Sequence, residues 1–213
     1  MNPQHPQASR NHGSRLTGED AFTLVELLVV VAILVALCGL LFPVLGRGKA
    51  QAQQAGCLSN LRQIGIATQI YTDENGSYPP AWVDGQTRWM DLLKPYLDKK
   101  ADVYLCPADR QRIAVTWDPT IHMSYGINSF RFGDQAHCFW YPVRAAAVPR
   151  PSATILFADC TPGKYYCGGG SKFKEPVPDV DYRHPGKSFV AVFCDGHAEM
   201  RTHTQQKDWD ASK

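Results

Sequence analysis

Residues 21–46 read AFTLVELLVVVAILVALCGLLFPVLG, and this stretch decides the fold of the N-terminal part of the chain. Between Phe22 and Leu45 the only charged residue is Glu26. An α-helix of that length rises about 36 Å at ~1.5 Å per residue, more than the ~30 Å hydrocarbon core of a bilayer. The stretch therefore predicts a membrane-spanning helix over residues 22–45.

Two other kinds of segment have a similar composition. A secretory signal peptide has an apolar core of about 7–15 residues that ends in a small-residue cleavage site. Here the apolar run is longer, and Arg47 and Lys49 follow it. The core helix of a large soluble protein is the second alternative. The length of the run favours membrane insertion.

The 20 residues before it are polar and indicate a disordered tail or a leader.

The helix is predicted to continue beyond the membrane, over residues 46–78. An apolar stripe with helical spacing supports this, and it consists of Cys57, Leu61, Ile64, Thr68 and Tyr71. The dipeptide at residues 75–76 is Asn-Gly, a helix stop signal, and two prolines follow at 79–80.

After residue 79 the chain consists of short apolar runs separated by Gly, Pro and Asp, a pattern that predicts strands. The runs are VYLC (103–106), MSYGINSF (123–130), HCFWYPV (137–143), ATILFADC (153–160) and SFVAVFC (188–194). Asp195-Gly196 then predicts a hairpin turn. We expect an α+β fold, in which a long N-terminal hydrophobic helix continues into a soluble domain, residues 79–213, with a small antiparallel β-sheet.

Composition and motifs exclude several function classes. The chain has 22 Lys and Arg against 20 Asp and Glu, and this near-neutral balance does not indicate nucleic acid as a partner. The sequence contains no serine elbow, P-loop or H-E-x-x-H pattern, and we predict no enzymatic activity.

Six of the seven cysteines follow the apolar segment and belong to the predicted soluble domain. In an oxidising compartment they allow up to three disulfides, whereas in the cytosol they would be buried thiols or metal ligands. Cys57 with Cys106 is one candidate disulfide, and Cys160 with Cys167 is another. For each pair the alternative is two buried thiols.

His184, Asp195 and His197 are candidate metal ligands, together with Asp159, Asp179 and Asp181. An Asp-rich group suits calcium, and two His with one Asp suit zinc. The spacing matches no defined metal motif, however. In the alternative interpretation Asp195 is a turn residue and His184 packs or caps a loop.

Glu26 is unexpected in a segment made for lipid. A charge at the bilayer centre costs roughly 2.5–3.5 kcal/mol on insertion scales, so such a residue predicts a function and a partner. A free amino group on Phe22 would be an apt partner. That group would exist only after cleavage between Ala21 and Phe22.

The residues Ala21 to Leu28 (AFTLVELL) resemble the signal of type IV prepilins and type II secretion pseudopilins. The resemblance implies that prepilin peptidase cleaves after a leader of residues 1–21 and N-methylates Phe22. Glu26, fifth in the mature chain, would then pair with the Phe22 amine of a neighbouring subunit. Ala21 stands where the family usually has Gly, and Pro43 matches a proline common in pilins.

A second resemblance covers CLSNLRQIG (57–65), Tyr78-Pro79-Pro80 and Leu105-Cys106-Pro107. These segments are similar to a pilin-like group whose C-terminus carries His, nine residues and Asp-Gly. Here His184 is followed by ten residues and then Asp195-Gly196. A structural calcium site near the C-terminus of a major pseudopilin family gives an analogy for metal binding here.

The resemblances together imply a pseudopilin, a structural subunit of a type II secretion pseudopilus. The subunit would span the inner membrane once, with its C-terminal domain outside the cytoplasm. Its partners would be prepilin peptidase, other pilin or pseudopilin subunits, the inner-membrane assembly platform and, before assembly, membrane lipid. The alternatives are a type IV pilin or minor pilin for adhesion, motility or DNA uptake, and a membrane-tethered metal-binding or enzymatic domain.

Overall fold

The computed structural model describes residues 22–97, 101–133 and 135–213. The predicted leader, including Ala21, lies outside the described residues. The chain divides into two compact units, Met1–Val44 and Leu45–Lys213, and each is treated by itself below.

Helix α1 extends over Leu24–Asn75 and includes both segments that were predicted to be helical. Its most apolar 18-residue window has a mean hydropathy of 3.1, and none of that window is buried. Within the described part of the chain, α1 is the one helix that is long and apolar enough to span a membrane. It ends at Asn75, and Gly76 has a φ of 69°, which confirms the predicted stop.

The remaining elements are short. They are β1 (Ser77–Tyr78), β2 (Trp82–Val83), β3 (Thr87–Arg88), α2 (Trp89–Leu93), η1 (Lys94–Tyr96), η2 (Ala101–Tyr104), β4 (Ala114–Val115), β5 (Asp118–His122), β6 (Tyr125–Phe130), η3 (Gln135–His137), β7 (Val143–Arg144), η4 (Ala145–Ala147), β8 (Ile155–Asp159), β9 (Tyr166–Gly170), β10 (Phe189–Phe193), β11 (Ala198–Arg201) and α3 (Gln206–Trp209), where η denotes a 3-10 helix.

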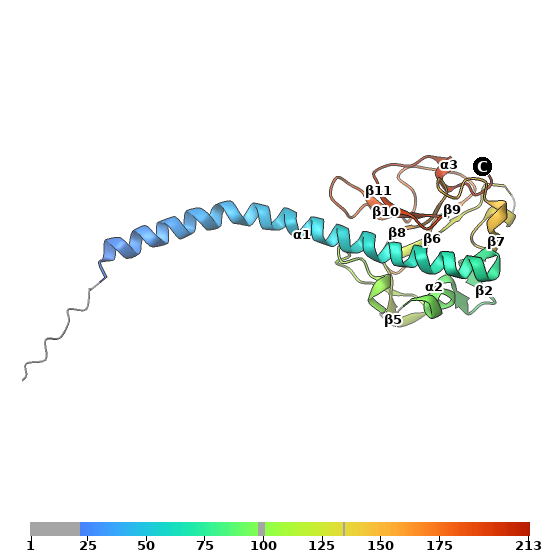
Figure 1. The fold of residues 1–213 in the computed structure, drawn as a ribbon, viewed down its shortest axis with the longest axis horizontal. Coiled ribbons are helices and arrows are strands. Elements are labelled where there is room, and N and C mark those ends of the chain that lie inside the picture. The colour runs from blue at the N-terminus through green and yellow to red at the C-terminus, as the bar shows by residue number, and fades with distance from the viewer. Residues whose placement is uncertain (1–21, 98–100, 134) are drawn as a thin grey trace, which may run out of the picture. The chain divides into compact units, whose positions relative to one another are not determined.

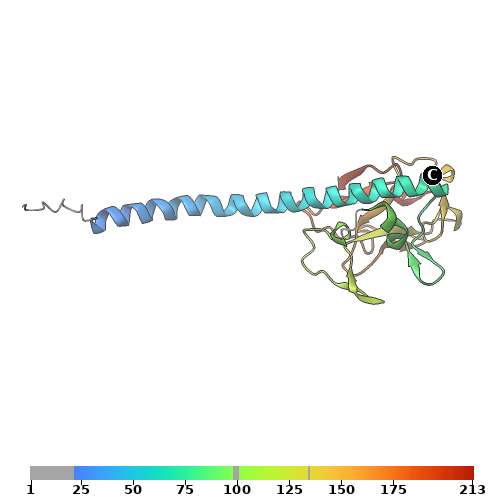
Figure 2. The ribbon, with the colours of Figure 1, turned by 60° about the horizontal axis from the view of Figure 1, so that its bottom comes forward.

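One five-stranded sheet organises residues 45–213, with strand order β11-β10-β8-β6-β9. All neighbours in it are antiparallel except β6 and β9, which run parallel. The α+β class is therefore confirmed, and the predicted hairpin joins β10 to β11. The second half of α1 runs alongside this sheet in both views (Figures 1 and 2).

Both faces of the sheet are covered by apolar side chains. In β10, Val190 and Val192 belong to one hydrophobic cluster, while Phe189, Ala191 and Phe193 belong to another. The predicted stripe of α1 joins the first cluster: Cys57, Leu61 and Ile64 are fully buried there. Coverage on two sides explains why this strand reads as a continuous apolar run rather than an alternating one.

Two of the runs predicted to be strands adopt other structures. VYLC enters the 3-10 helix η2, where the Leu105 N–H donates to the Asp102 carbonyl at 3.0 Å. Most of HCFWYPV forms a turn in which the Tyr141 N–H donates to the Cys138 carbonyl oxygen at 2.9 Å. Only Val143 of this run enters a strand, β7. Local i to i+3 hydrogen bonds satisfy these backbone groups in place of a ladder.

Candidate functional site

The start of α1 is closed by a capping box formed by Thr23 and Glu26. The Glu26 carboxylate accepts from the Thr23 backbone N–H at 2.9 Å and from its hydroxyl at 2.7 Å. The Glu26 N–H donates to the Thr23 hydroxyl at 3.2 Å in return. These bonds satisfy N–H groups that a helix start otherwise leaves unpaired. Glu26 thus has a local partner in Thr23, one residue from the predicted mature terminus at Phe22.

A second group of functional side chains lies in the interior of residues 45–213. One donor atom from each of Cys57, Cys106, Asp159 and His184 lies within 4.8 Å of all the others. The first three residues are fully buried, and His184 is 4% exposed. They come from four segments: α1, the loop after η2, the end of β8 and the loop before β10. Tertiary folding alone brings them together.

The contacts within this four-residue cluster converge on Asp159 and on one nitrogen of His184. The Cys57 thiol donates to Asp159 Oδ1 at 3.2 Å, and His184 Nε2 lies 3.1 Å from Oδ2. The same Nε2 lies 3.6 Å from Cys106 Sγ. His184 Nδ1 is buried and has no hydrogen-bond partner among the described residues.

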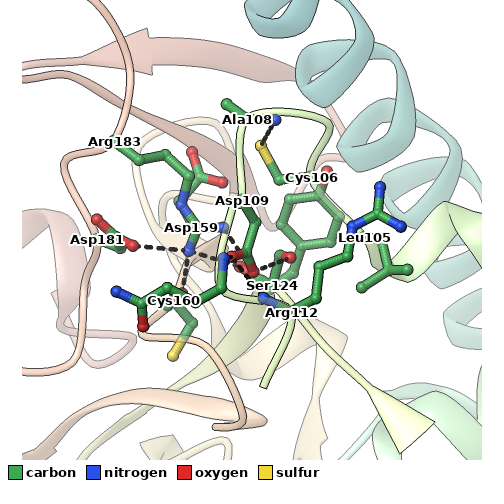
Figure 3. A network of polar contacts seen from close by, with 12 residues as sticks. Leu105, Cys106, Ala108, Asp109, Arg112, Ser124, Asp159, Cys160, Asp181 and Arg183 are labelled. Atoms are coloured by element: carbon green, nitrogen blue, oxygen red, sulfur yellow. Dashed lines mark hydrogen bonds and ion pairs between the residues drawn. The ribbon is translucent and has the colours of Figure 1, made fainter. Parts of the chain in front are cut away.

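Hydrogen-bond donors also point at both sulfur atoms. The Tyr125 hydroxyl donates to Cys57 Sγ at 3.3 Å, and the Ala108 N–H donates to Cys106 Sγ at 3.4 Å. The second contact is drawn in Figure 3. The Val190 N–H donates to Asp159 Oδ2 at 2.7 Å. Donors of this kind favour the anionic forms of thiol and carboxyl groups.

The cluster separates charge between Cys106 and His184. The hydrogen bond from Cys57 lowers the pKa of Cys106 to about 6 despite the opposing effect of burial, and His184 adds to the lowering. Burial alone would lower the pKa of His184, but its hydrogen bonds to Asp159 and Cys106 outweigh burial and raise it to about 9. Burial raises the pKa of Cys57. The two cysteines are therefore shifted in opposite directions, Cys106 toward the thiolate and Cys57 toward the neutral thiol.

Beside the cluster, Arg183 joins several segments (Figure 3). Its guanidinium lies 3.3 Å from an Asp109 carboxylate oxygen and 3.1 Å from one of Asp181, and it donates to the Cys160 carbonyl. Asp109 also accepts from the Ser124 hydroxyl at 2.7 Å. A cavity of about 450 Å³ reaches this network and His184, so solvent approaches one edge of the cluster.

The sequence-predicted ligands are therefore only partly brought together. His184 and Asp159 meet, but Asp195 and His197 pair with each other at 2.5 Å in the β10–β11 turn and lie outside the four-residue cluster. Asp179 pairs with Lys164. The candidate disulfide residues Cys57 and Cys106 lie together in the cluster, and no disulfide joins them in this structure.

Comparisons of the chain with protein-family models, curated proteins and solved structures gave no match.

All four members of the cluster were among the candidate residues predicted from the sequence, but they were predicted in separate sets. Cys57 and Cys106 were paired as a disulfide, while His184 and Asp159 were grouped with other acidic residues. A signal was present for Asp159, because it ends a fully buried apolar strand, ILFAD. A carboxylate in such a place requires buried partners. Sequence spacing gave no indication of which residues these were.

The chemistry of the donor set limits what the cluster does. In a Cys–His–Asp catalytic triad the thiol and the carboxylate contact opposite nitrogens of the imidazole. Here both face Nε2. The Cys106 side chain is also fully buried, which keeps substrates away from the sulfur. Calcium prefers oxygen ligands, and this set supplies two sulfurs and one nitrogen.

Proposed function

We propose that this chain is a pseudopilin, a structural subunit that prepilin peptidase processes and that assembles through α1 into a type II secretion pseudopilus. The observation that carries the proposal is the position of Glu26. It is the one charge between residues 22 and 45, and it lies four residues after the predicted mature terminus, Phe22.

The exposed surface of α1 supports an assembly role. Large apolar side chains within residues 24–42, and that of Leu45, are about half to three-quarters exposed in the isolated chain. Apolar area of this extent is unfavourable in water and must be covered by lipid or by other protein. Lipid before assembly and helices of neighbouring subunits afterwards would cover the same surface.

The capping box gives Glu26 a role in the helix start in addition to the proposed pairing between subunits. A test of assembly must separate these two roles. In the proposed filament the Glu26 carboxylate pairs with the methylated amine of Phe22 in a neighbouring subunit. In the single chain it caps α1 through Thr23. Glutamine at the same helix position retains the cap but carries no charge. Glu26→Gln therefore isolates the charge, and Thr23→Val removes the side-chain cap while keeping the charge.

The test of processing is mass spectrometry of the mature N-terminus in the native cell. We expect a chain that begins with N-methylated Phe22. An intact Met1, or a terminus at another residue, would contradict the proposal.

The test of assembly compares the two variants in the native cell, scored by cross-linked oligomers and filament yield. We expect Glu26→Gln to be cleaved normally but to lose most assembly, and Thr23→Val to retain more of it. Normal assembly of Glu26→Gln would argue against the pairing. Deletion of the gene then distinguishes the filament type: loss of exported proteins indicates a secretion pseudopilus, whereas loss of adhesion, motility or DNA uptake indicates a type IV pilus.

A further inference from the structure

The cluster of Cys57, Cys106, Asp159 and His184 gathers four potential metal ligands in the buried interior. Its four donor atoms lie within 4.8 Å of one another, and three of the residues are completely buried. Burying a charged group is costly unless it is paired or coordinates a metal. Here two cysteine sulfurs, a carboxyl group and an imidazole ring share one interior space.

We propose that these four residues bind one Zn²⁺ ion. Two sulfurs, one imidazole nitrogen and one carboxylate oxygen are all ligands that zinc accepts, and four protein ligands complete its usual coordination. The convergence of Cys106 and Asp159 on the same nitrogen of His184 is expected of ligands that face a common centre. It is not the arrangement of a proton relay.

The surroundings fit anionic ligands. Tyr125 and Ala108 donate to the two sulfurs, and Val190 donates to the carboxylate. Donors behind the ligands orient them and tune a bound metal. Two thiolates, one carboxylate and a neutral imidazole with Zn²⁺ sum to a charge of −1.

Binding needs no oxidant or reductant. The ligand atoms give up to solvent any protons they carry as the four metal bonds form, so zinc uptake releases protons. Since all four coordination positions come from the protein, the site would be structural rather than catalytic. The metal would connect α1 to β8 and to two loops within residues 45–213.

Zinc binding and a Cys57–Cys106 disulfide exclude each other, because a disulfide leaves no thiolate on either residue. The first experiment therefore measures both. The full-length chain is purified in detergent without chelator or reductant, its zinc is quantified by elemental mass spectrometry, and its free thiols are alkylated after denaturation. We expect one zinc per chain and alkylation of both Cys57 and Cys106. Recovery of a Cys57–Cys106 disulfide would overturn the inference.

Variants then locate the metal. Cys106→Ser and His184→Gln should lose stoichiometric zinc, whereas Cys138→Ser and His197→Gln, which change residues outside the cluster, should retain it. Tyr125→Phe removes the donor to Cys57 and should weaken zinc binding about 10–100-fold. Tyr104→Phe is its control, because that hydroxyl donates to the Met90 carbonyl instead. Equal zinc in ligand and control variants would count against the site.

A spectroscopic measurement on the unmutated chain keeps the test valid if a ligand variant fails to fold. Metal-free chain is titrated with Co²⁺, which reports its ligands by absorption. We expect tetrahedral cobalt bands and a thiolate-to-cobalt charge-transfer band that one equivalent of Zn²⁺ abolishes. Cobalt bound without the thiolate band, or no binding of either ion by free thiols, would refute the proposal.

Discussion

Gly65 of α1 and Gly196 of the β10–β11 turn approach so closely that a Cβ on Gly65 would lie 2.5 Å from the Gly196 carbonyl oxygen. Gly196 itself has a φ of 87°, in the left-handed region that favours glycine. Gln69, one turn further along α1, donates to the carbonyl of Cys194 at 2.7 Å. The helix is thus held directly against the hairpin.

This approach predicts the effect of Gly65→Ala. The added methyl must displace the backbone of the turn, and we expect a loss of about 1–3 kcal/mol in unfolding free energy. All five tryptophans lie between residues 82 and 209, so tryptophan fluorescence during thermal unfolding reports on this domain. Gly48→Ala is the control, because a Cβ there meets nothing within 4 Å. It should be neutral or stabilise by up to about 1 kcal/mol.

Asn128 provides a second prediction. Its buried amide donates to the carbonyls of Ile155 and Trp209, each at 2.9 Å, and its oxygen accepts from the Phe130 N–H. Asn128→Asp keeps the shape but turns the donor into an acceptor that faces two carbonyls. We expect a loss of about 2–4 kcal/mol, since each unsatisfied buried group costs roughly 1–3 kcal/mol.

The control for that change is Asn75→Asp, at the exposed end of α1. Placing a negative charge at a helix C-terminus costs no more than about 1 kcal/mol. Similar losses for the two variants in the same fluorescence measurement would mean that the buried bonds of Asn128 contribute little.

Arg183 is predicted to be a structural cation. Its side chain is 6% exposed and faces Asp109 and Asp181. Arg183→Met would leave the buried Asp109 carboxylate without its cation, and breaking a buried pair costs about 3–5 kcal/mol. Arg201→Met breaks an exposed pair with Glu199 and should cost no more than about 1 kcal/mol. Thermal unfolding of both variants would distinguish the two effects, and equal stability would contradict the role of Arg183.

The predicted membrane-spanning segment, residues 22–45, is tested by charge insertion. The double variant Leu34→Arg/Leu37→Arg places two charges in the apolar window and should weaken insertion by about 5–7 kcal/mol. We expect much of this variant to appear in the carbonate-soluble fraction, while the unmutated chain and Leu34→Ala/Leu37→Ala stay with membranes. Retention of the arginine variant in membranes would indicate that another part of the chain anchors it.

Local signals were sufficient for much of the fold. The stop at Asn75-Gly76, the buried stripe of α1 and the turn at Asp195-Gly196 are each set by residues close in sequence. The runs VYLC and HCFWYPV were wrong as strands, because short apolar runs fit a buried 3-10 turn as well as a strand. The parallel pairing of β9 with β6 also had no local signal.

The sequence by itself determined the apolar helix, the position of Glu26 within it and the α+β class. These features depend on hydrophobicity and on spacings of a few residues, so they can be inferred from residues that are close in sequence. Only the tertiary structure decided that Cys57 and Cys106 lie with Asp159 and His184, and that Asp195 and His197 lie elsewhere. The four residues of the cluster are separated by tens of positions along the chain. Their meeting depends on how α1, β8 and two loops pack, which no short stretch of sequence encodes.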